Sequence, residues 1–588
     1  MKERRAIVLT VFLSVVCVAF SVCGFLTIRK DEQQPLNLKS AVQEDFSLEP
    51  YINEDSCSFF IPSGMNYEDL FIVSDQAVYC NGKKINNTAL SEYAEEEEKI
   101  INIDDLEYGL FFYRSENVPA LFIDTLRADT NYLNADKNNR VDFRASLFDS
   151  DGKKQFSSAT GVIKGRGNNS WDTKKKSYNL NFNSEIDLLE MGKACRWVLV
   201  PNSSDNTKVY NKTVYDFASE TGLYWTPECK YVDLYLNGVY NGLYLLTEKI
   251  EADEERLDLG KNDLLLKREL PMRLDQVDNG FKTENGNVIE ITYPNDVTPY
   301  HKEQIQREVQ KMEDAIFDLD SDEWKNVIDM DSWARCYLID ELFDNLDAGI
   351  ASANYYLKDG KFYRGPVWDY DSIMLDNPKS MIANTYFRQP YSVNDYYYLL
   401  NQREEFLSRV KELFQSEFRP LISEYVDGKI DQISNGIIAA REMDGARWNY
   451  HFVQSSITNF KYYLNEKAVF MEEYWANRDR YCKVLVQSEI FYRTFMVEKG
   501  KSIRDAINLD MSLFENNEYH YAESDQAFSL DDVVDEDVRL DIVFEEEPVE
   551  ERSLIREFGI LNIAFLLLFA ILFLYVIIKG IIRNYVGY

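Results

Sequence analysis

Histidine and paired cysteine motifs are scarce in this sequence, and their scarcity excludes several common catalytic sites. The 588 residues include three histidines, His301, His451 and His520. A Ser-His-Asp triad or an HExxH metalloprotease needs histidine in a specific local context, which none of the three has. The eight cysteines form no CxxC pair, so we do not expect a zinc ribbon. Any catalysis must therefore use carboxylates, lysine, arginine and asparagine.

Basic residues are too few to indicate a nucleic-acid partner. The chain has 64 Lys and Arg against 100 Asp and Glu, which gives a net charge of −36. Binding to phosphate backbones needs a basic surface, so the composition argues against it. Hydrophobic residues make up 45% of the chain, enough for a large core. Cys57 and Cys80 could form a disulfide, and free buried thiols are an equally good interpretation.

Two long apolar runs predict membrane spans. The first covers residues 6–28 after MKERR, and the second covers residues 559–578 before Lys579 and Arg583. About 20 apolar residues are enough to cross a bilayer, and positive flanks favour the cytoplasmic side. We therefore expect a two-pass protein of the cell membrane, with both termini cytoplasmic and the large domain extracytoplasmic. A cleaved signal peptide is the alternative for the first run.

Composition and periodicity divide the chain into seven predicted segments. We expect the segments at the two ends to cross or flank the membrane. We expect the three large segments between them to form folded domains. The segments are an N-terminus with its anchor (1–30), a small β module (45–112), a mixed domain (113–482), a β-grasp-like repeat module (487–548), an acidic stalk (549–558), a transmembrane helix (559–578) and a cytoplasmic tail (579–588). In the mixed domain, VDLYLNGVYNGLYLL predicts a hairpin with Asn237-Gly238 as its turn.

The block IKGRGNNSWDTKKKSYNLNF (163–182) concentrates positive charge in this acidic chain. Lys164 and Arg166 alternate with glycines, and three lysines at 174–176 follow. Glycine lets a backbone approach a ligand closely, and free N–H groups in such a loop can cradle phosphates. We therefore expect an anionic ligand here. A basic, solvated hairpin loop is the alternative.

Two further blocks supply carboxylates and an amide. Asp347 and Asn354 follow an apolar helix in LIDELFDNLDAGIASANYYLKDG, and Asp369 and Asp371 lie in the aromatic run VWDYDSI. A charge among aromatic residues needs a compensating partner. If VWDYDSI is a strand, the two aspartates face the same side, and oxygen ligands of this kind suit Mg²⁺ or Mn²⁺. We therefore expect a metal as the partner. An acidic turn with Trp368 in the core is the alternative.

The order of these blocks is the order that phosphoryl transfer uses. A glycine-containing basic loop and a lysine come first, an Asp with a downstream Asn follows, and a metal-binding Asp comes last, as in eukaryotic-type kinases. Over residues 115–480 the chain resembles the spore-coat protein H (CotH) kinase family of atypical kinases. The motifs that carry the resemblance are IKGRGNNSW…KKKSYNLNF, WVLVPNSSDNTKVYNKTVYDFA, VDLYLNGVYNGLYLLTEKIE, NYYLKDGKF and VWDYDS.

The resemblance implies a nucleotide site on the N-terminal side. Lys176, which precedes the strand SYNLNF, resembles the lysine on the α- and β-phosphates. Arg166 and Lys164 would line the loop over the phosphates. Glu248 at the end of the hairpin, or an acid of the helix NKTVYDFASE, would orient the lysine. Strand register decides which of the lysines 174–176 contacts phosphate, so all three stay open.

The resemblance also implies a catalytic and metal site. Asp347 resembles the catalytic-loop Asp that aligns the acceptor hydroxyl, Asn354 and Asp369 would hold the metal, and Asp371 would be a second acidic ligand. Asp347 and Asn354 are seven residues apart, against about five in ordinary kinases, so Asp344 is an alternative to Asp347. Asp371 also stands where ordinary kinases have the glycine of DFG.

These observations predict a fold class and a function. We expect an α+β protein in which a divergent protein-kinase-like domain is flanked by small β modules, with two transmembrane helices. Its predicted function is that of a membrane-anchored extracytoplasmic Ser/Thr protein kinase, with ATP and Mg²⁺ or Mn²⁺ as cofactors and surface or secreted proteins as substrates. The alternatives are a non-catalytic binding or adhesion protein on the same scaffold, and nucleotidyl transfer.

Overall fold

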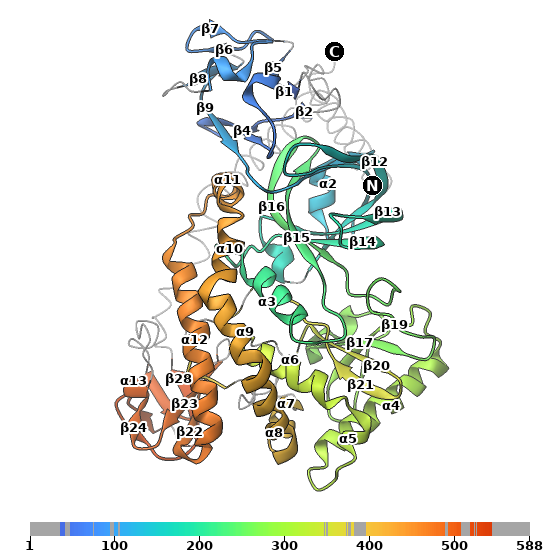
Figure 1. The fold of residues 1–588 in the computed structure, drawn as a ribbon, viewed down its shortest axis with the longest axis vertical. Coiled ribbons are helices and arrows are strands. Elements are labelled where there is room, and N and C mark those ends of the chain that lie inside the picture. Colours follow the sequence, from blue (N-terminus) through green and yellow to red (C-terminus); the bar gives the residue numbers. More distant parts are fainter. Residues whose placement is uncertain are drawn as a thin grey trace, which may run out of the picture. The chain divides into compact units, whose positions relative to one another are not determined.

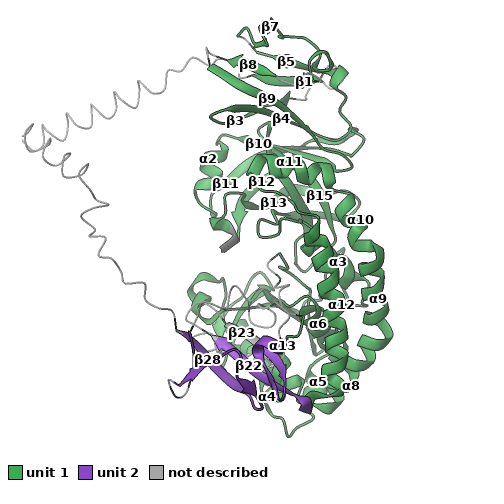
Figure 2. Cartoon of the chain, turned by 90° about the vertical axis from the view of Figure 1, so that its left-hand side faces the viewer, with its two compact units in different colours: residues 1–478 green, residues 479–588 purple. Residues whose placement is uncertain are grey.

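The computed structural model describes residues 36–543 apart from several internal stretches. These stretches are 41–46, 75, 95–98, 104–105, 168, 346, 348–350, 372, 374–377, 382–395, 488–491, 507–517, 523 and 525. The chain divides into two units, Met1–Arg478 and Asp479–Tyr588 (Figure 2).

A closed barrel of seven strands is the centre of the first unit, with neighbours in the order β10-β11-β12-β13-β14-β16-β15 (Figure 1). Its strands are β10 (Ala120–Leu126), β11 (Arg140–Phe148), β12 (Lys154–Arg166), β13 (Ser177–Asp187), β14 (Lys193–Val200), β15 (Cys229–Leu236) and β16 (Val239–Glu248). Alternate side chains of a strand point to opposite faces, so every second residue can fill the barrel. Ile163, Leu180 and Leu246 are fully buried members of that core.

The predicted hairpin is confirmed as β15 and β16. Asn237 and Gly238 join the two strands with φ angles of 51° and 80°. Asparagine and glycine tolerate this left-handed conformation, which a tight hairpin turn requires. The Asn237 side chain accepts a hydrogen bond from the Thr125 N–H at 2.7 Å, which ties the turn to β10.

A second sheet follows the barrel, with strands in the order β18-β19-β17-β20-β21. Its strands are β17 (Leu264–Glu269), β18 (Phe281–Lys282), β19 (Val288–Tyr293), β20 (Ala353–Lys358) and β21 (Lys361–Arg364). The helices α4 (Pro299–Phe317), α5 (Trp324–Val327) and α6 (Met330–Leu342) lie between β19 and β20 in the chain. Trp333 of α6 donates its indole N–H to the Phe362 carbonyl at 2.9 Å, which fixes the helix against β21.

Further helices complete the first unit. They are α2 (Thr130–Ala135), α3 (Tyr210–Ser219), α7 (Tyr396–Leu400), α8 (Glu404–Leu413), α9 (Arg419–Glu424), α10 (Ile430–Asn435), α11 (Ile438–Trp448) and α12 (Ser455–Ala476), with π-helical turns at Phe414–Phe418 and Tyr425–Lys429. Short 3₁₀ helices lie at Tyr67–Asp69, Leu90–Glu92, Asn169–Asp172, Pro271–Gln276 and Arg478–Arg480. Among them, α3 follows β14 directly and α11 packs against β16.

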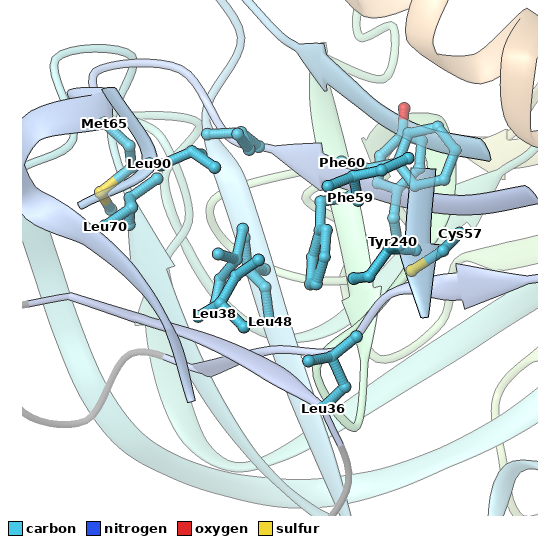
Figure 3. Close-up of a cluster of buried hydrophobic side chains, with 14 of the residues drawn as sticks. Leu36, Leu38, Leu48, Cys57, Phe59, Phe60, Met65, Leu70, Leu90 and Tyr240 are labelled. Carbon is cyan, nitrogen blue, oxygen red and sulfur yellow. The ribbon is translucent and has the colours of Figure 1, made fainter. Parts of the chain in front are cut away.

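The N-terminal β module shares its core with the barrel. Its strands are β1 (Asn37–Ser40), β2 (Ser47–Leu48), β3 (Tyr51–Ile52), β4 (Ser56–Ile61), β5 (Leu70–Val73), β6 (Tyr79–Cys80), β7 (Lys83–Lys84), β8 (Ile100–Ile103) and β9 (Leu106–Arg114). Phe60 stacks on Tyr240 of β16 with ring centroids 4.9 Å apart (Figure 3). Tyr235 of β15 donates its hydroxyl to the Phe60 carbonyl at 3.0 Å. The sequence left open whether Cys57 and Cys80 form a disulfide. In the structure both thiols are buried and neither is in a disulfide.

The second unit contains a five-stranded sheet and a two-stranded one. The sheets have the orders β23-β22-β28-β25-β26 and β24-β27. The elements are β22 (Tyr481–Gln487), β23 (Tyr492–Glu498), β24 (Lys501–Ser502), α13 (Ile503–Ala506), β25 (Glu518–Tyr521), β26 (Ala527–Phe528), β27 (Val533–Val534) and β28 (Val538–Val543). The predicted boundaries of the folded modules stay predictions.

The predicted fold class and location need a correction. The structure is mixed α/β, with sheets and a seven-stranded barrel, and no helix among the described residues is long and apolar enough to cross a membrane. Helix α12 has 22 residues, but Lys461 and several glutamates lie along it, and such charges are costly within a bilayer. The predicted spans, residues 6–28 and 559–578, lie outside the described residues. The two transmembrane helices and the two-pass location are therefore not supported.

Candidate active site

The end of strand β12 carries positive charge to the outer face of the barrel. Ile163 is buried in the barrel, so the alternation of side chains directs Lys164 and Arg166 outward. Gly165 between them is required for a steric reason, because a Cβ atom there would lie 2.4 Å from the ring of Trp171. The sequence predicted that glycine here lets a ligand approach the backbone. The structure shows that Gly165 also makes room for the ring of Trp171.

Arg166 is a compensating partner of the two aspartates in VWDYDSI. Its guanidinium lies 5.1 Å from the ring centroid of Trp368. Burial lowers the pKa of Arg166, and the charges of Asp369 and Asp371 act against this by raising it. The carboxylates therefore face a cation from a segment about 200 residues earlier in the chain. The sequence had indicated a metal in this role.

The aspartates lie in a turn and not in a strand. Strand β21 ends at Arg364, and Asp369 follows with a φ angle of 72°. The Asp369 side chain is exposed and that of Asp371 is half-buried. The Oγ of Ser352 lies 3.4 Å from one Asp369 carboxylate oxygen, to which it donates a long hydrogen bond. The strand that would have placed both carboxylates on one face is therefore absent here, and the turn decides where they point.

Helix α3 holds the backbone of this turn. The Tyr370 N–H donates to Asn211 Oδ1 at 2.8 Å, and the Asp369 N–H donates to the Tyr215 hydroxyl at 3.3 Å. The Tyr215 ring also stacks on Trp368 with centroids 5.9 Å apart. The helix that the sequence predicted from NKTVYDFASETG therefore contributes directly to the site.

Asp347 lies in the loop after α6, close to Asp369. Its side chain reaches solvent. Surrounding protein nevertheless raises the pKa of Asp347 to about 6, and the negative charge of Asp369 adds to the rise. The cation of Arg273 partly opposes it. A carboxyl with this pKa is mostly ionised at neutral pH and is more basic than an ordinary aspartate.

Asn354 on strand β20 has a fixed side-chain amide. Its Nδ2 donates to the Pro366 carbonyl at 3.0 Å, and the residue is only 6% exposed. Within the described part of the chain no group donates to its Oδ1. The hydrogen bond to Pro366 orients the amide, which leaves the oxygen as the group that can accept a ligand.

The donor set suits a hard divalent cation that is held partly by a substrate. Asp369, Asp371 and Asn354 offer two carboxylates and an amide oxygen. The described residues contain no group of three or more His, Cys, Asp or Glu side chains arranged to hold a metal ion by themselves. Mg²⁺ is commonly bound through one or two carboxylates together with phosphate oxygens and water. The residues present fit that mode and do not fit an all-protein metal cage.

Comparison with protein families assigns these residues to a known group. A model of the CotH kinase protein family matches residues 163–482, more than half of the 588-residue chain. The chain belongs to the CotH kinase protein family. The matched region contains Arg166 and every residue of the cluster around Asp369, so the predicted family resemblance is confirmed. A search of the curated proteins gives no match.

The three lysines of the KKK segment differ in their surroundings. Lys176 donates to the Trp171 carbonyl at 2.5 Å and its ammonium lies 4.8 Å from the Trp171 ring centroid, so it is engaged within its own hairpin. Lys174 is exposed. Lys175 is buried and forms an ion pair with Asp444 of α11 at 2.8 Å. None of the three has a contact with the aspartate turn among the contacts between described residues.

Glu248 lies in a different set of charges from the one predicted. Its carboxylate pairs with Arg256 at 3.3 Å and accepts a hydrogen bond from the Glu228 N–H at 2.8 Å. Burial raises its pKa to about 7. Its role as the residue that orients Lys176 stays a prediction, and Arg256 is the cation that it contacts.

Two lysines outside the predicted set lie close to the site. Burial lowers the pKa of Lys249 to about 8, and the nearby cations Arg196, Lys164 and Arg166 contribute to the decrease. Burial lowers the pKa of Lys208. The negative charge of Asp371 partly opposes this decrease. Both occur in motifs that the family resemblance used, Lys249 in LYLLTEKIE and Lys208 in PNSSDNTKVY. Lys249 directly follows Glu248, so a basic residue next to a predicted site residue could have indicated it as a candidate from the sequence.

Asp344, the alternative to Asp347, is enclosed by the protein. It is 3% exposed, and the Ser380 hydroxyl donates to its carboxylate at 3.2 Å. Lys467 donates to the same hydroxyl at 3.2 Å and forms a fully buried ion pair with Glu341 at 2.9 Å. This network leaves Asp347 as the more accessible of the two carboxylates.

We expect Asp444→Asn to destabilise the first unit strongly. Asp444 is fully buried and is the partner of Lys175 at 2.8 Å and of Lys208 at 3.8 Å. Removing its charge takes away the ion-pair partner of two buried ammonium groups, which costs about 3–5 kcal/mol. Urea unfolding of the full chain, followed by tryptophan fluorescence, measures the change.

The matched control is Asp431→Asn. Asp431 pairs with Lys461 at 2.5 Å, but the two side chains are 39% and 24% exposed. An exposed pair contributes about 0–1 kcal/mol, so this variant should unfold close to the wild type. Equal losses in the two variants would contradict the assignment of Asp444 as a buried counter-ion.

Proposed function

We propose that the protein is a kinase that transfers the γ-phosphate of ATP to serine or threonine of protein substrates. The observation that carries the proposal is the convergence of Arg166, Asp347, Asn354, Asp369 and Asp371. They come from the end of β12, the loop after α6, strand β20 and the turn after β21. Phosphoryl transfer depends mainly on positioning and on charge stabilisation, for which a cation opposite clustered carboxylates is suited.

In this proposal the outer face of the barrel binds the phosphates. Arg166 supplies a guanidinium that can hold two phosphate oxygens at once, as planar forks do. Lys164 and Lys249 lie near it, and burial with neighbouring positive charge lowers the pKa of each. Cations held close together repel one another, and an anionic ligand relieves that repulsion. We therefore assign Lys249 the phosphate-binding role that the sequence gave to Lys176.

The turn and β20 form the metal side of the site. Asn354, Asp369 and Asp371 would hold Mg²⁺ or Mn²⁺ against the phosphates. A bound divalent ion neutralises charge that develops on the transferred group. The Pro366 carbonyl orients the Asn354 amide, and Arg166 compensates the aspartates when no cation is bound.

Asp347 would align the acceptor hydroxyl and accept its proton. The side chain is exposed, so a protein substrate can reach it. Its pKa of about 6 leaves it deprotonated at neutral pH yet basic enough to accept a hydrogen bond from serine or threonine. The charge of Asp369 acts on Asp347, which supports an acceptor position next to the metal side.

The first test incubates the full chain with ATP, Mg²⁺ or Mn²⁺ and a mixed protein extract. We expect transfer of γ-label to protein that requires metal and falls at least about 100-fold in Asp369→Ala, since removal of a transition-state charge partner typically costs that much. The control is Asp314→Ala on the exposed face of α4, which should retain full activity.

The label used separates the alternatives. Transfer from α-labelled but not from γ-labelled ATP would establish nucleotidyl transfer and overturn the kinase assignment. Absence of both transfer and ATP binding would leave a non-catalytic binding protein on a kinase-like scaffold.

A second prediction separates Lys249 from Lys176. Lys249→Ala should weaken ATP binding about 10- to 100-fold, the effect of losing one charge-assisted hydrogen bond of 1.5–3 kcal/mol. Lys176→Ala should change it less than about threefold, because this ammonium is engaged by Trp171. Calorimetric titration with a non-hydrolysable ATP analogue measures both. A larger loss in Lys176→Ala would return the role to the lysine of the hairpin.

A further inference from the structure

The turn that carries the two aspartates has an unfavourable backbone. Asp369 has a φ angle of 72°, in the left-handed region that non-glycine residues adopt rarely. Such a conformation persists when surrounding contacts hold it in place. The directions of the Asp369 and Asp371 carboxylates depend on this backbone, so the groups that hold it also control the site.

Two side chains of α3 take up consecutive N–H groups of the turn. Asn211 accepts from the Tyr370 N–H at 2.8 Å and Tyr215 accepts from the Asp369 N–H at 3.3 Å. Asn211 and Tyr215 are four residues apart, so they lie on one face of the helix, one turn apart. Tyr370 is 1% exposed, and its N–H could not find water if Asn211 were removed.

The Asn211 amide is itself held in one orientation. Its Nδ2 donates to Asn202 Oδ1 at 2.9 Å, and the Asn202 carbonyl accepts from Lys208 Nζ at 2.9 Å. Lys208 lies 3.8 Å from Asp444 of α11. Asn202, Lys208 and Asn211 are each at most 2% exposed. The amide oxygen of Asn211 must therefore face Tyr370, because its nitrogen is engaged by Asn202.

We propose that Asn211 is a positioning residue for the metal-binding turn, and that Asn202, Lys208 and Asp444 hold it in place. The inference rests on the proposed function, in which Asp369 and Asp371 bind a divalent cation. Asn211 touches neither the cation nor the nucleotide and acts through the backbone of Tyr370. The segment PNSSDNTKVYN, which none of the predicted roles used, thereby acquires one: it links α11 to the turn.

The test measures Mn²⁺ affinity of the full-length protein by electron paramagnetic resonance, with and without ATP, beside phosphotransfer. Asn211→Leu keeps the number and branching of the side-chain heavy atoms, with bulkier methyl groups, but cannot accept the Tyr370 N–H. Mutation of a residue that supports a metal ligand commonly costs about 10- to 100-fold in metal affinity or activity. We expect a loss of that size in Mn²⁺ affinity, with phosphotransfer restored in part by higher Mn²⁺ concentration.

Thr213→Val is the matched control on the same helix. Thr213 is fully buried, and its hydroxyl has no hydrogen-bond partner among the described residues. The variant replaces a buried polar group of α3 by an apolar one without touching the turn, so it should bind Mn²⁺ as the wild type does. Tyr215→Phe is the second test variant, because it removes only the acceptor of the Asp369 N–H and keeps the ring on Trp368. We expect it to lose about threefold in Mn²⁺ affinity, less than Asn211→Leu, since its bond is longer.

The outcomes separate this inference from the proposed function. If a folded Asn211→Leu variant binds Mn²⁺ as tightly as the wild type, the positioning role is overturned. It is also overturned if Thr213→Val loses as much Mn²⁺ affinity as Asn211→Leu. If Asn211→Leu does not fold, an unchanged Mn²⁺ affinity in Tyr215→Phe overturns it. Wild-type protein that binds Mn²⁺ but transfers no phosphate refutes the kinase proposal alone, and the affinities still decide the role of Asn211. Wild-type protein that binds no Mn²⁺ refutes both.

Discussion

The charge balance between Arg166 and the aspartate turn is the interaction on which the site depends. The guanidinium at the end of β12 is costly to bury beside Trp368, and the charges of Asp369 and Asp371 after β21 offset that cost. The barrel, which places Arg166, and the second sheet, which places the turn, thus share one electrostatic requirement. Arg166, the one arginine of the basic block 163–182, meets this local need in a chain of net charge −36.

Buried polar contacts join the barrel to the helices. Asp444 of α11 accepts the Leu243 N–H of β16 at 2.8 Å and pairs with Lys175 of the 174–176 segment. On its other side lies Lys208, which reaches the turn through Asn202 and Asn211. A single carboxylate on a helix after residue 430 therefore stabilises segments from three earlier parts of the chain. Such networks specify one arrangement because each member has a fixed partner.

Some of the predicted site residues lie near Asp369 and others do not. The contacts of each side chain explain the difference. The charges of Arg166 and Asp347 act on or beside Asp369, and Asn354 donates to the Pro366 carbonyl that precedes it. Lys176 and Glu248 instead contact Trp171 and Arg256. Residue type and spacing can nominate a lysine and a glutamate, but the partner of each is set by strand register and by loops distant in sequence.

The sequence by itself determined the local elements and the family. The Asn237-Gly238 hairpin, the helix of NKTVYDFASETG and the kinase-family motifs follow from turn chemistry, periodicity and residue order, which are local properties. Only the tertiary structure decided which cation faces Asp369 and Asp371, because Arg166 and the turn are about 200 residues apart. It also decided that Asp369 and Asp371 lie in a turn and that α3 holds this turn. The left-handed backbone of Asp369 depends on contacts with α3, which is distant in the sequence, so no local pattern predicts it.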